Sequence, residues 1–146
     1  MKTLKLTLAI TLTAAFTWAV AHADDTTSGS TPATLPPDST KTGVTFDTDI
    51  KPIFHDTCMP CHSSTGPRKP RGGLALDTLA GTLKGGKDGT VLKAGDSAHS
   101  DLVLSVAHMG DDPDGFMPKG FPGKPAKMLT PDQIGLIRAW IDQGAK

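Results

Sequence analysis

The pentapeptide "CMPCH", residues 58–62, is the feature that most constrains this chain of 146 residues. It contains the only two cysteines, Cys58 and Cys61, which are separated by two residues and followed directly by His62. A cysteine pair with this spacing can serve as a redox disulfide, as half of a zinc site, or as two anchors for a covalently attached group. The compartment of the protein and the surrounding elements discriminate between these uses.

The first 23 residues predict export. Lys2 and Lys5 precede the apolar run "LTLAITLTAAFTWAVA", and the small residues Ala21 and Ala23 end it, which is typical of a secretory signal peptide cleaved after Ala23. A retained membrane anchor is the alternative, but the apolar run is short for crossing a bilayer. We therefore expect a periplasmic or secreted protein with no membrane span after signal cleavage.

Cleavage also changes the charge of the chain. The precursor has 15 basic and 15 acidic residues, and loss of the two lysines of the signal leaves 13 basic against 15 acidic residues. The mature chain then carries a net charge of about −2 with neutral histidines, which does not suit a nucleic-acid binder.

Two of the three uses of the cysteine pair suit this chain poorly. A disulfide between Cys58 and Cys61 would close a very small loop and stabilise little, because the entropic gain grows with loop length. A thioredoxin-type pair follows a strand, whereas the segment before Cys58 has a helical pattern. A zinc site needs four ligands, and the sequence offers no second C-x-x-C or H-x-x-x-H pair.

The third use is the attachment of a c-type haem, for which C-x-x-C-H is the signature. Two thiols in one turn can reach the two vinyl groups of a porphyrin edge and form thioethers, and the next residue can bind the iron. The sequence therefore predicts one covalently bound haem c, held by Cys58 and Cys61, with His62 as the proximal ligand. The export signal and the small number of large apolar side chains support this prediction, because a buried cofactor would fill the core.

The predicted organisation is a signal peptide (1–23), a disordered linker (24–43) and one domain (44–146). The linker, "DDTTSGSTPATLPPDSTKTG", is rich in Ser, Thr and Pro and has no apolar period. The domain is expected to be all-α, with about four short helices around the covalent haem. "GLAL" and "TVLKAG" are short enough to form a minor two-stranded β element.

Four segments of the domain have helical patterns. In "FDTDIKPIFHD" Asp47 is the expected N-cap, and in "DSAHSDLVLSVAH" it is Asp96. "LDTLAGTL" is a shorter candidate that ends at two glycines. The clearest segment is "TPDQIGLIRAWIDQGAK", which has the capping box of Thr130 and Gln133 and a terminating glycine at Gly144.

Several segments resemble a known family, the class I-like cytochrome c domains of the planctomycete type. They are "DIKPIF" before the cysteine motif, then "RGGLALD", "AGDSAHSDLVLSVAH", "FMPKG" and "LTPDQIGLIRAWIDQGA". The family typically has Met-Pro-Pro where this chain has Met117, Pro118 and Lys119, so the Met-Pro pair is intact. The resemblance implies a cytochrome c fold, electron transfer without enzymatic activity, redox partner proteins, and the cytochrome c maturation machinery as a partner.

The second axial ligand is expected to be Met117, which lies in an extended loop before Pro118 and matches the Met-Pro pair of the family. His108 is the main alternative and would give a bis-histidine haem of lower potential. Met109 is a weaker candidate. A surface position on a helix is the favoured interpretation for His99 and also for His108, and His55 is expected to pack or to be exposed. The Nδ1–H of His62 needs an acceptor, and a carbonyl of the loop "GPRKPRGG" is expected to supply it.

These observations predict a monohaem c-type cytochrome that carries single electrons between redox partners. Two alternatives stay open, namely a haem-based sensor or enzyme module with an open or bis-histidine distal site, and a haem module of a larger complex tethered by the linker. Two basic clusters could surround a haem edge and attract an acidic partner. They consist of Arg68, Lys69 and Arg71, and of Lys119, Lys124 and Lys127.

Overall fold

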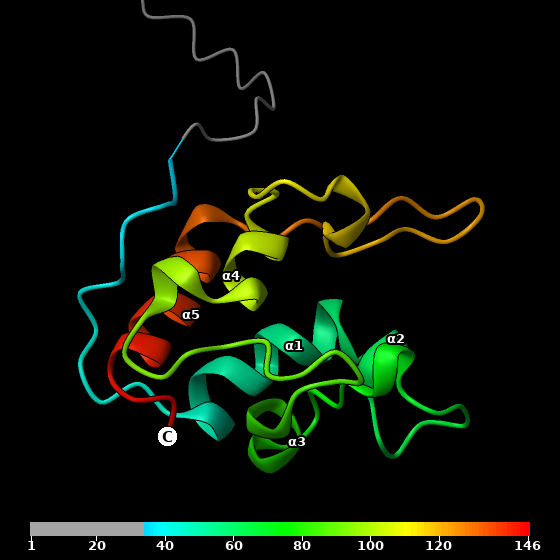
Figure 1. The fold of residues 1–146 in the computed structure, drawn as a ribbon, viewed down its shortest axis with the longest axis horizontal. Helices are drawn as coiled ribbons and strands as arrows, with labels where there is room; N and C mark the ends of the chain where they lie inside the picture. The colour runs from blue at the N-terminus through cyan, green and yellow to red at the C-terminus, as the bar shows by residue number, and fades with distance from the viewer. Residues whose placement is uncertain (1–33) are drawn as a thin grey trace, which may run out of the picture.

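The computed structural model describes residues 34–146, so the predicted signal peptide and residues 24–33 lie outside the described residues. The described part is helical (Figure 1). Its α-helices are Lys51–Thr57 (α1), Met59–His62 (α2), Leu79–Lys84 (α3), Asp101–Val106 (α4) and Pro131–Asp142 (α5). Its shorter helical turns are Phe46–Ile50 (η1), Arg71–Gly73 (η2), Ser97–His99 (η3) and Pro113–Gly115 (η4).

This architecture agrees with the predicted all-α class and differs from the prediction in two details. Five α-helices replace the four expected, because the "CMPCH" segment forms a helix of its own, α2. The minor β element is absent from residues 34–146, where the β pairing consists of isolated bridges. The two segments expected to form it bond to other parts of the chain, since Leu76 N donates to His62 O and Leu102 N donates to Val91 O, each at 2.7 Å.

The first helical segment starts differently from the prediction. Asp47 is not the N-cap, because it lies inside η1 and pairs with Lys51 at 3.2 Å. Asp49 satisfies the start of the helix instead, since one of its oxygens accepts from Thr45 N at 2.9 Å. A π-helical turn precedes Pro52, whose missing N–H and bulky ring do not fit regular α-helical bonding to the preceding turn.

The core forms where α5 crosses η1 and α1. Trp140, Phe46 and Phe54 are fully buried, and the Phe46 ring lies 6.2 Å from that of Phe54 and 5.8 Å from that of Trp140. Trp140 Nε1 donates to Lys146 O at 3.0 Å, so the indole has a partner for its only polar group. The C-terminus is thereby held next to the start of η1, where Phe46 N also donates to Lys146 O.

The last helix has the termini that its sequence predicts. Thr130 accepts from Gln133 N at 3.2 Å, and the Gln133 side chain accepts from Thr130 N at 2.9 Å, which completes the capping box. Gly144 follows the helix with φ 98°, a conformation that glycine adopts without strain. Both ends of α5 are therefore specified by local sequence.

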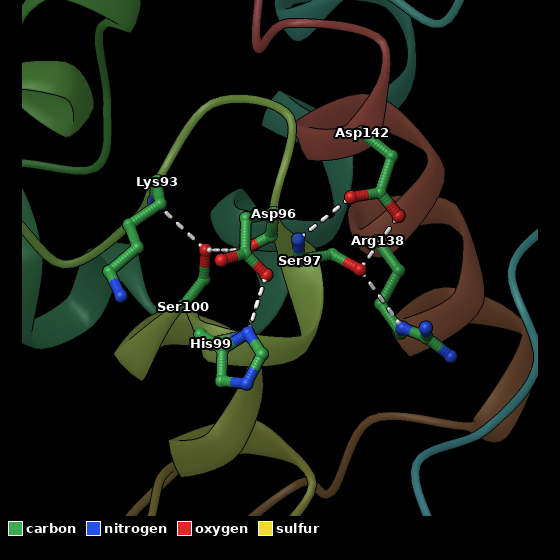
Figure 2. Close-up of polar contacts among 7 residues, drawn as sticks. All are labelled: Lys93, Asp96, Ser97, His99, Ser100, Arg138 and Asp142. Atoms are coloured by element: carbon green, nitrogen blue, oxygen red, sulfur yellow. Dashed lines mark hydrogen bonds and ion pairs between the residues drawn. The ribbon is translucent and has the colours of Figure 1, made fainter.

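The segment 96–108 contains a break that the sequence pattern does not predict. Asp96 caps it as expected by accepting from His99 N, but the chain turns at Ser100 between η3 and α4 (Figure 2). The buried Ser100 hydroxyl donates to Asp96 O at 2.8 Å and accepts from Lys93 N at 2.9 Å. A serine side chain that bonds the local backbone competes with helix formation, which explains the break.

A polar cluster joins η3 to α5 (Figure 2). Both carboxylate oxygens of Asp142 accept from Ser97, one from its backbone N–H and one from its hydroxyl, each at 2.7 Å. Arg138 Nε donates to the same hydroxyl at 3.2 Å. Ser97 is 1% exposed and all its polar atoms are engaged within the fold, so this cluster is structural.

Residues 36–41, expected to belong to a disordered linker, lie along α5 in the structure (Figure 1, cyan). Ser39 N donates to Gly135 O at 3.0 Å, and Arg138 pairs with Asp38 at 2.9 Å and donates to Pro36 O. The close approach depends on Gly135, because a Cβ at this position would lie 2.5 Å from Pro37 O. Contacts with a distant helix hold this segment, and its own composition gives no sign of them.

Gly135→Ala is expected to destabilise the protein by about 1–3 kcal/mol, since the new methyl group overlaps the Pro37 carbonyl. Alanine is otherwise the better helix former by about 1 kcal/mol. In a chain that starts at Thr40 the clash is absent, and the same substitution should be neutral or stabilising. Denaturant unfolding of the wild type and of Gly135→Ala, each in the full and in the shortened chain, measures this change of sign in the free energy of unfolding. Destabilisation of equal size in the shortened chain would contradict the proposed contact.

Candidate functional site

The cysteine motif forms one compact turn between α1 and α2. Cys58 ends α1 and begins α2, and its carbonyl accepts from both Cys61 N (3.1 Å) and His62 N (2.9 Å). Pro60 lies in the first turn of α2, where its missing N–H removes no helical bond. This turn brings Cys58, Cys61 and His62 to the wall of the same cavity. Both cysteines are free thiols.

The surroundings of Cys58 do not resemble those of a reactive redox cysteine. Burial raises the pKa of the thiol above its ordinary value, although Thr57 Oγ1, at 3.2 Å from Sγ, acts in the opposite direction. Thiol–disulfide enzymes need a lowered pKa, because the thiolate is the attacking form. The pair is therefore better suited to a permanent bond than to repeated oxidation and reduction.

The His62 ring is oriented by the segment that follows the motif. Its Nδ1 lies 3.2 Å from Leu74 O, and a carbonyl only accepts, so Nδ1 is the protonated nitrogen and Nε2 carries the lone pair in the neutral ring. Burial lowers the pKa of His62, and the nearby Arg71 charge acts in the same direction. The acceptor was expected within residues 66–73 and is instead the next residue, Leu74.

The cavity beside these residues is mainly apolar and opens to the solvent. Its volume is about 290 Å³, at the lower end of the roughly 300–1,000 Å³ of usual small-molecule sites. α2 and α4 both contribute to it, together with the loop that carries Met117. The apolar side chains of its wall include Leu74, Leu76, Val91, Leu102 and Val106. Charged residues also line it, namely Arg71, Asp88, Asp101 and Lys119.

Met117 lines this cavity from the loop after η4. The residue is half-buried, and its backbone is held on both sides, since Met117 N donates to Ser105 O and Met117 O accepts from His108 Nε2, each at 3.0 Å. The structure thus brings Met117 to the same cavity as Cys58, Cys61 and His62, although 55 positions separate it from His62 in the sequence.

The other candidate ligands lie outside the lining of the cavity. His99 has an exposed side chain, as predicted, and pairs with Asp96; His55, for which packing and exposure were both open, is exposed and pairs with Asp56. His108 is bonded to the Met117 carbonyl and stacked on Phe116. Met109 is partly buried against the core, and Met128 is 45% exposed.

The carboxylate of Asp77, which the sequence analysis did not single out, binds the segment that directly follows the cysteine motif. Asp77 is 7% exposed and accepts from Ser63, Ser64 and Thr65, the three residues after His62, at distances of 2.8–3.4 Å. Burial acts to raise the pKa of Asp77, but these hydrogen bonds outweigh it and lower the pKa to about 2. The run "SST" and the acid of "LALD" are the only sequence signs of this contact.

Asp77→Asn is expected to destabilise the protein by about 1–3 kcal/mol at neutral pH, because several hydrogen bonds to a charged acceptor are weakened or lost. The lowered pKa stabilises the wild type above about pH 4, and this contribution is lost as the pH falls towards 2. Unfolding curves between pH 2 and 7 should therefore show a weaker pH dependence in the variant. Asp47→Asn, on the exposed face of η1, is the control; equal behaviour of the two variants would contradict the role of Asp77.

Within residues 34–146, no group of three or more His, Cys, Asp or Glu side chains is arranged to hold a metal ion. No helix in the same range is long and apolar enough to cross a membrane.

Comparison with known families gives a match over residues 58–120 to the model described as Planctomycete cytochrome C. The matched range starts at Cys58 and ends three residues after Met117, and this match confirms the resemblance noted in the sequence. No curated protein and no solved structure matches the chain significantly. Because cytochromes c carry haem and transfer electrons, the match supports haem-based electron transfer as the class of function.

Proposed function

We propose that this protein is an exported monohaem c-type cytochrome, with Cys58 and Cys61 as the covalent anchors and with His62 and Met117 as the axial ligands. One observation carries this proposal most directly. The same apolar cavity is lined by both thiols and the histidine on one side and by a methionine from a distant loop on the other. The haem iron would supply reversible one-electron chemistry when the haem is bound.

The cavity suits a haem in three respects. Its apolar wall can cover a porphyrin face, its two thiols lie one helical turn apart, and the Nε2 lone pair of His62 is left available by the bond from Nδ1 to Leu74 O. Arg71 and Lys119 supply positive charge at the lining for the propionate groups. The donor set of one imidazole and one thioether is that of electron-carrying cytochromes.

The side chains of this site are suited to holding both ligand positions during electron transfer. The Leu74 carbonyl fixes the tautomer and plane of the His62 ring. Ser105 and His108 hold the Met117 peptide, and Asp77 holds the segment after His62. Residues that are held in both oxidation states need little rearrangement, which favours single-electron transfer over substrate chemistry.

The second candidate is a haem-based sensor or enzyme module with an open or bis-histidine distal site. The hydrogen bond of His108 Nε2 to Met117 O argues against the bis-histidine form, because the same nitrogen would have to leave this carbonyl to bind iron. The half-buried Met117 at the cavity argues against an open form.

Export follows from the predicted signal peptide. The cytochrome c maturation machinery is an expected partner, because the haem has to be attached to Cys58 and Cys61. Redox partner proteins are the expected partners. Arg68, Lys69 and Arg71 are exposed next to the cysteine motif, and Lys119 and Lys124 are exposed near Met117, so an acidic partner surface would be attracted to the mouth of the cavity.

The absorption spectrum of the ferrous haem-loaded protein, recorded with and without carbon monoxide, tests this proposal. We expect no fast spectral change on adding the gas, because His62 and Met117 occupy both axial positions. A rapid change would show that the sixth position is open and would favour the sensor or enzyme module.

A further inference from the structure

His108 lies directly after α4, in a backbone conformation that histidine adopts uncommonly. Its φ is 54°, and its N–H donates to Ser105 O while Met109 N donates to Leu104 O. This left-handed residue ends α4 and turns the chain into the loop that leads to Met117. The turn keeps the histidine next to the loop and outside the lining of the cavity.

The His108 ring contacts the Met117 loop in two ways. It stacks on Phe116 with a centroid separation of 5.0 Å and an interplanar angle of 15°. Its Nε2 lies 3.0 Å from Met117 O, and because a carbonyl only accepts, Nε2 is the donor. The ring thus holds the methionine and the residue before it.

A second bond completes the attachment of the Met117 peptide to α4. Met117 N donates to Ser105 O at 3.0 Å, and Ser105, like its neighbours Leu102 and Val106, lines the cavity. Part of the cavity wall and the backbone anchor of Met117 therefore belong to the same short helix, α4. Only the His108 half of this attachment comes from a side chain, so substitution can remove it selectively.

We infer that His108 is a positioning residue for the methionine ligand, which keeps the Met117 loop closed over the cavity and sets how often the thioether leaves the iron. The inference rests on the proposed role of Met117. It gives His108 a role that is neither iron ligation nor that of an ordinary surface histidine. Loss of this hydrogen bond should raise the population of the methionine-off state about tenfold, equivalent to about 1.4 kcal/mol.

Three substitutions of His108 separate its contacts. His108→Phe keeps a ring that can stack on Phe116 and removes the donor. His108→Asn suits the left-handed backbone but has a side chain too short to replace Nε2. His108→Gln has an amide nitrogen at nearly the same reach and restores a donor. His99→Gln is the matched control, because His99 is exposed and does not line the cavity.

The measurements use the haem-loaded protein and two readouts of the sixth ligand. These are the methionine–iron charge-transfer band of the ferric form and the rate of carbon monoxide binding to the ferrous form. We expect His108→Phe and His108→Asn to weaken the band and to bind the gas about tenfold faster, whereas His108→Gln and His99→Gln stay within about twofold of the wild type. Two variants that lack a donor at the position of Nε2 guard against a failure of one of them to fold.

The outcomes distinguish this inference from the proposed function. If His108→Phe and His108→Asn both keep the wild-type band and rate while Met117→Ala loses the band, the positioning role is wrong and the ligation stands. If His108→Gln fails to restore the band and the rate, the hydrogen bond to Met117 O is not what holds the loop, and the inference is wrong. If Met117→Ala leaves the spectrum unchanged, both the ligation and the positioning role are wrong.

Discussion

Replacing both Cys58 and Cys61 by alanine is expected to give a protein that releases its haem into acidified organic solvent, because neither thioether can form. The apolar wall of the cavity is then no longer covered by a covalently bound haem. A loss of about 3 kcal/mol, the scale of emptying a large core site, lowers the melting temperature by about 10–25 °C for a domain of this size. Thermal unfolding of the purified variant measures this change.

The two single variants are the controls for this experiment. Cys58→Ala and Cys61→Ala each leave one thioether, so both should keep haem in the solvent extraction and melt between the wild type and the double variant. A double variant that melts as cooperatively and at the same temperature as the wild type would show that the haem contributes little to the fold.

Met117→Ala is expected to open the sixth position and to lower the reduction potential. A thioether stabilises ferrous over ferric iron, and axial ligands set haem potentials over a range of about 0.8 V, so we expect a decrease on the order of 100 mV. The ferrous variant should also bind carbon monoxide rapidly, because alanine offers no ligand for the sixth position. Redox titration and gas binding measure the two effects.

Met128→Ala is the matched control, since Met128 lies in the same long loop region, is 45% exposed and lies outside the cavity lining. It should leave the potential and the spectrum unchanged. If the two methionine variants behave alike, Met117 is not the ligand and His108 or Met109 has to be reconsidered.

Local sequence was sufficient for the elements whose signals lie within a few residues. The capping box of Thr130 and Gln133 needs only positions three apart, and the Asp96 cap likewise bonds to His99. The break at Ser100 was missed because a helical pattern of apolar residues does not reveal that a buried serine bonds the backbone on both sides. The choice of Asp47 over Asp49 as the helix cap was wrong for a different reason, because two nearby acids can compete for one cap and the sequence does not show which of them bonds.

Half of the candidate site could be predicted from a short stretch of sequence. Cys58, Cys61 and His62 lie within one helical turn, so their spacing alone brings them together, and the compartment predicted by the signal peptide limits what a cysteine pair can do there. Methionines and histidines in a loop rich in Gly and Pro have no period, so only Pro118 and the resemblance to the family favoured Met117 over Met109 or His108.

Tertiary structure decided which of these residues reaches the cavity. Ser105 and His108 hold the Met117 peptide beside the cavity wall, and the Leu74 carbonyl, not one of the preceding loop, orients His62. The attachment of residues 36–41 to Gly135 is likewise invisible in a segment of Pro, Ser and Thr. Each of these contacts joins parts of the chain that only packing brings within hydrogen-bond distance, and for that reason they follow from the fold and not from any local pattern.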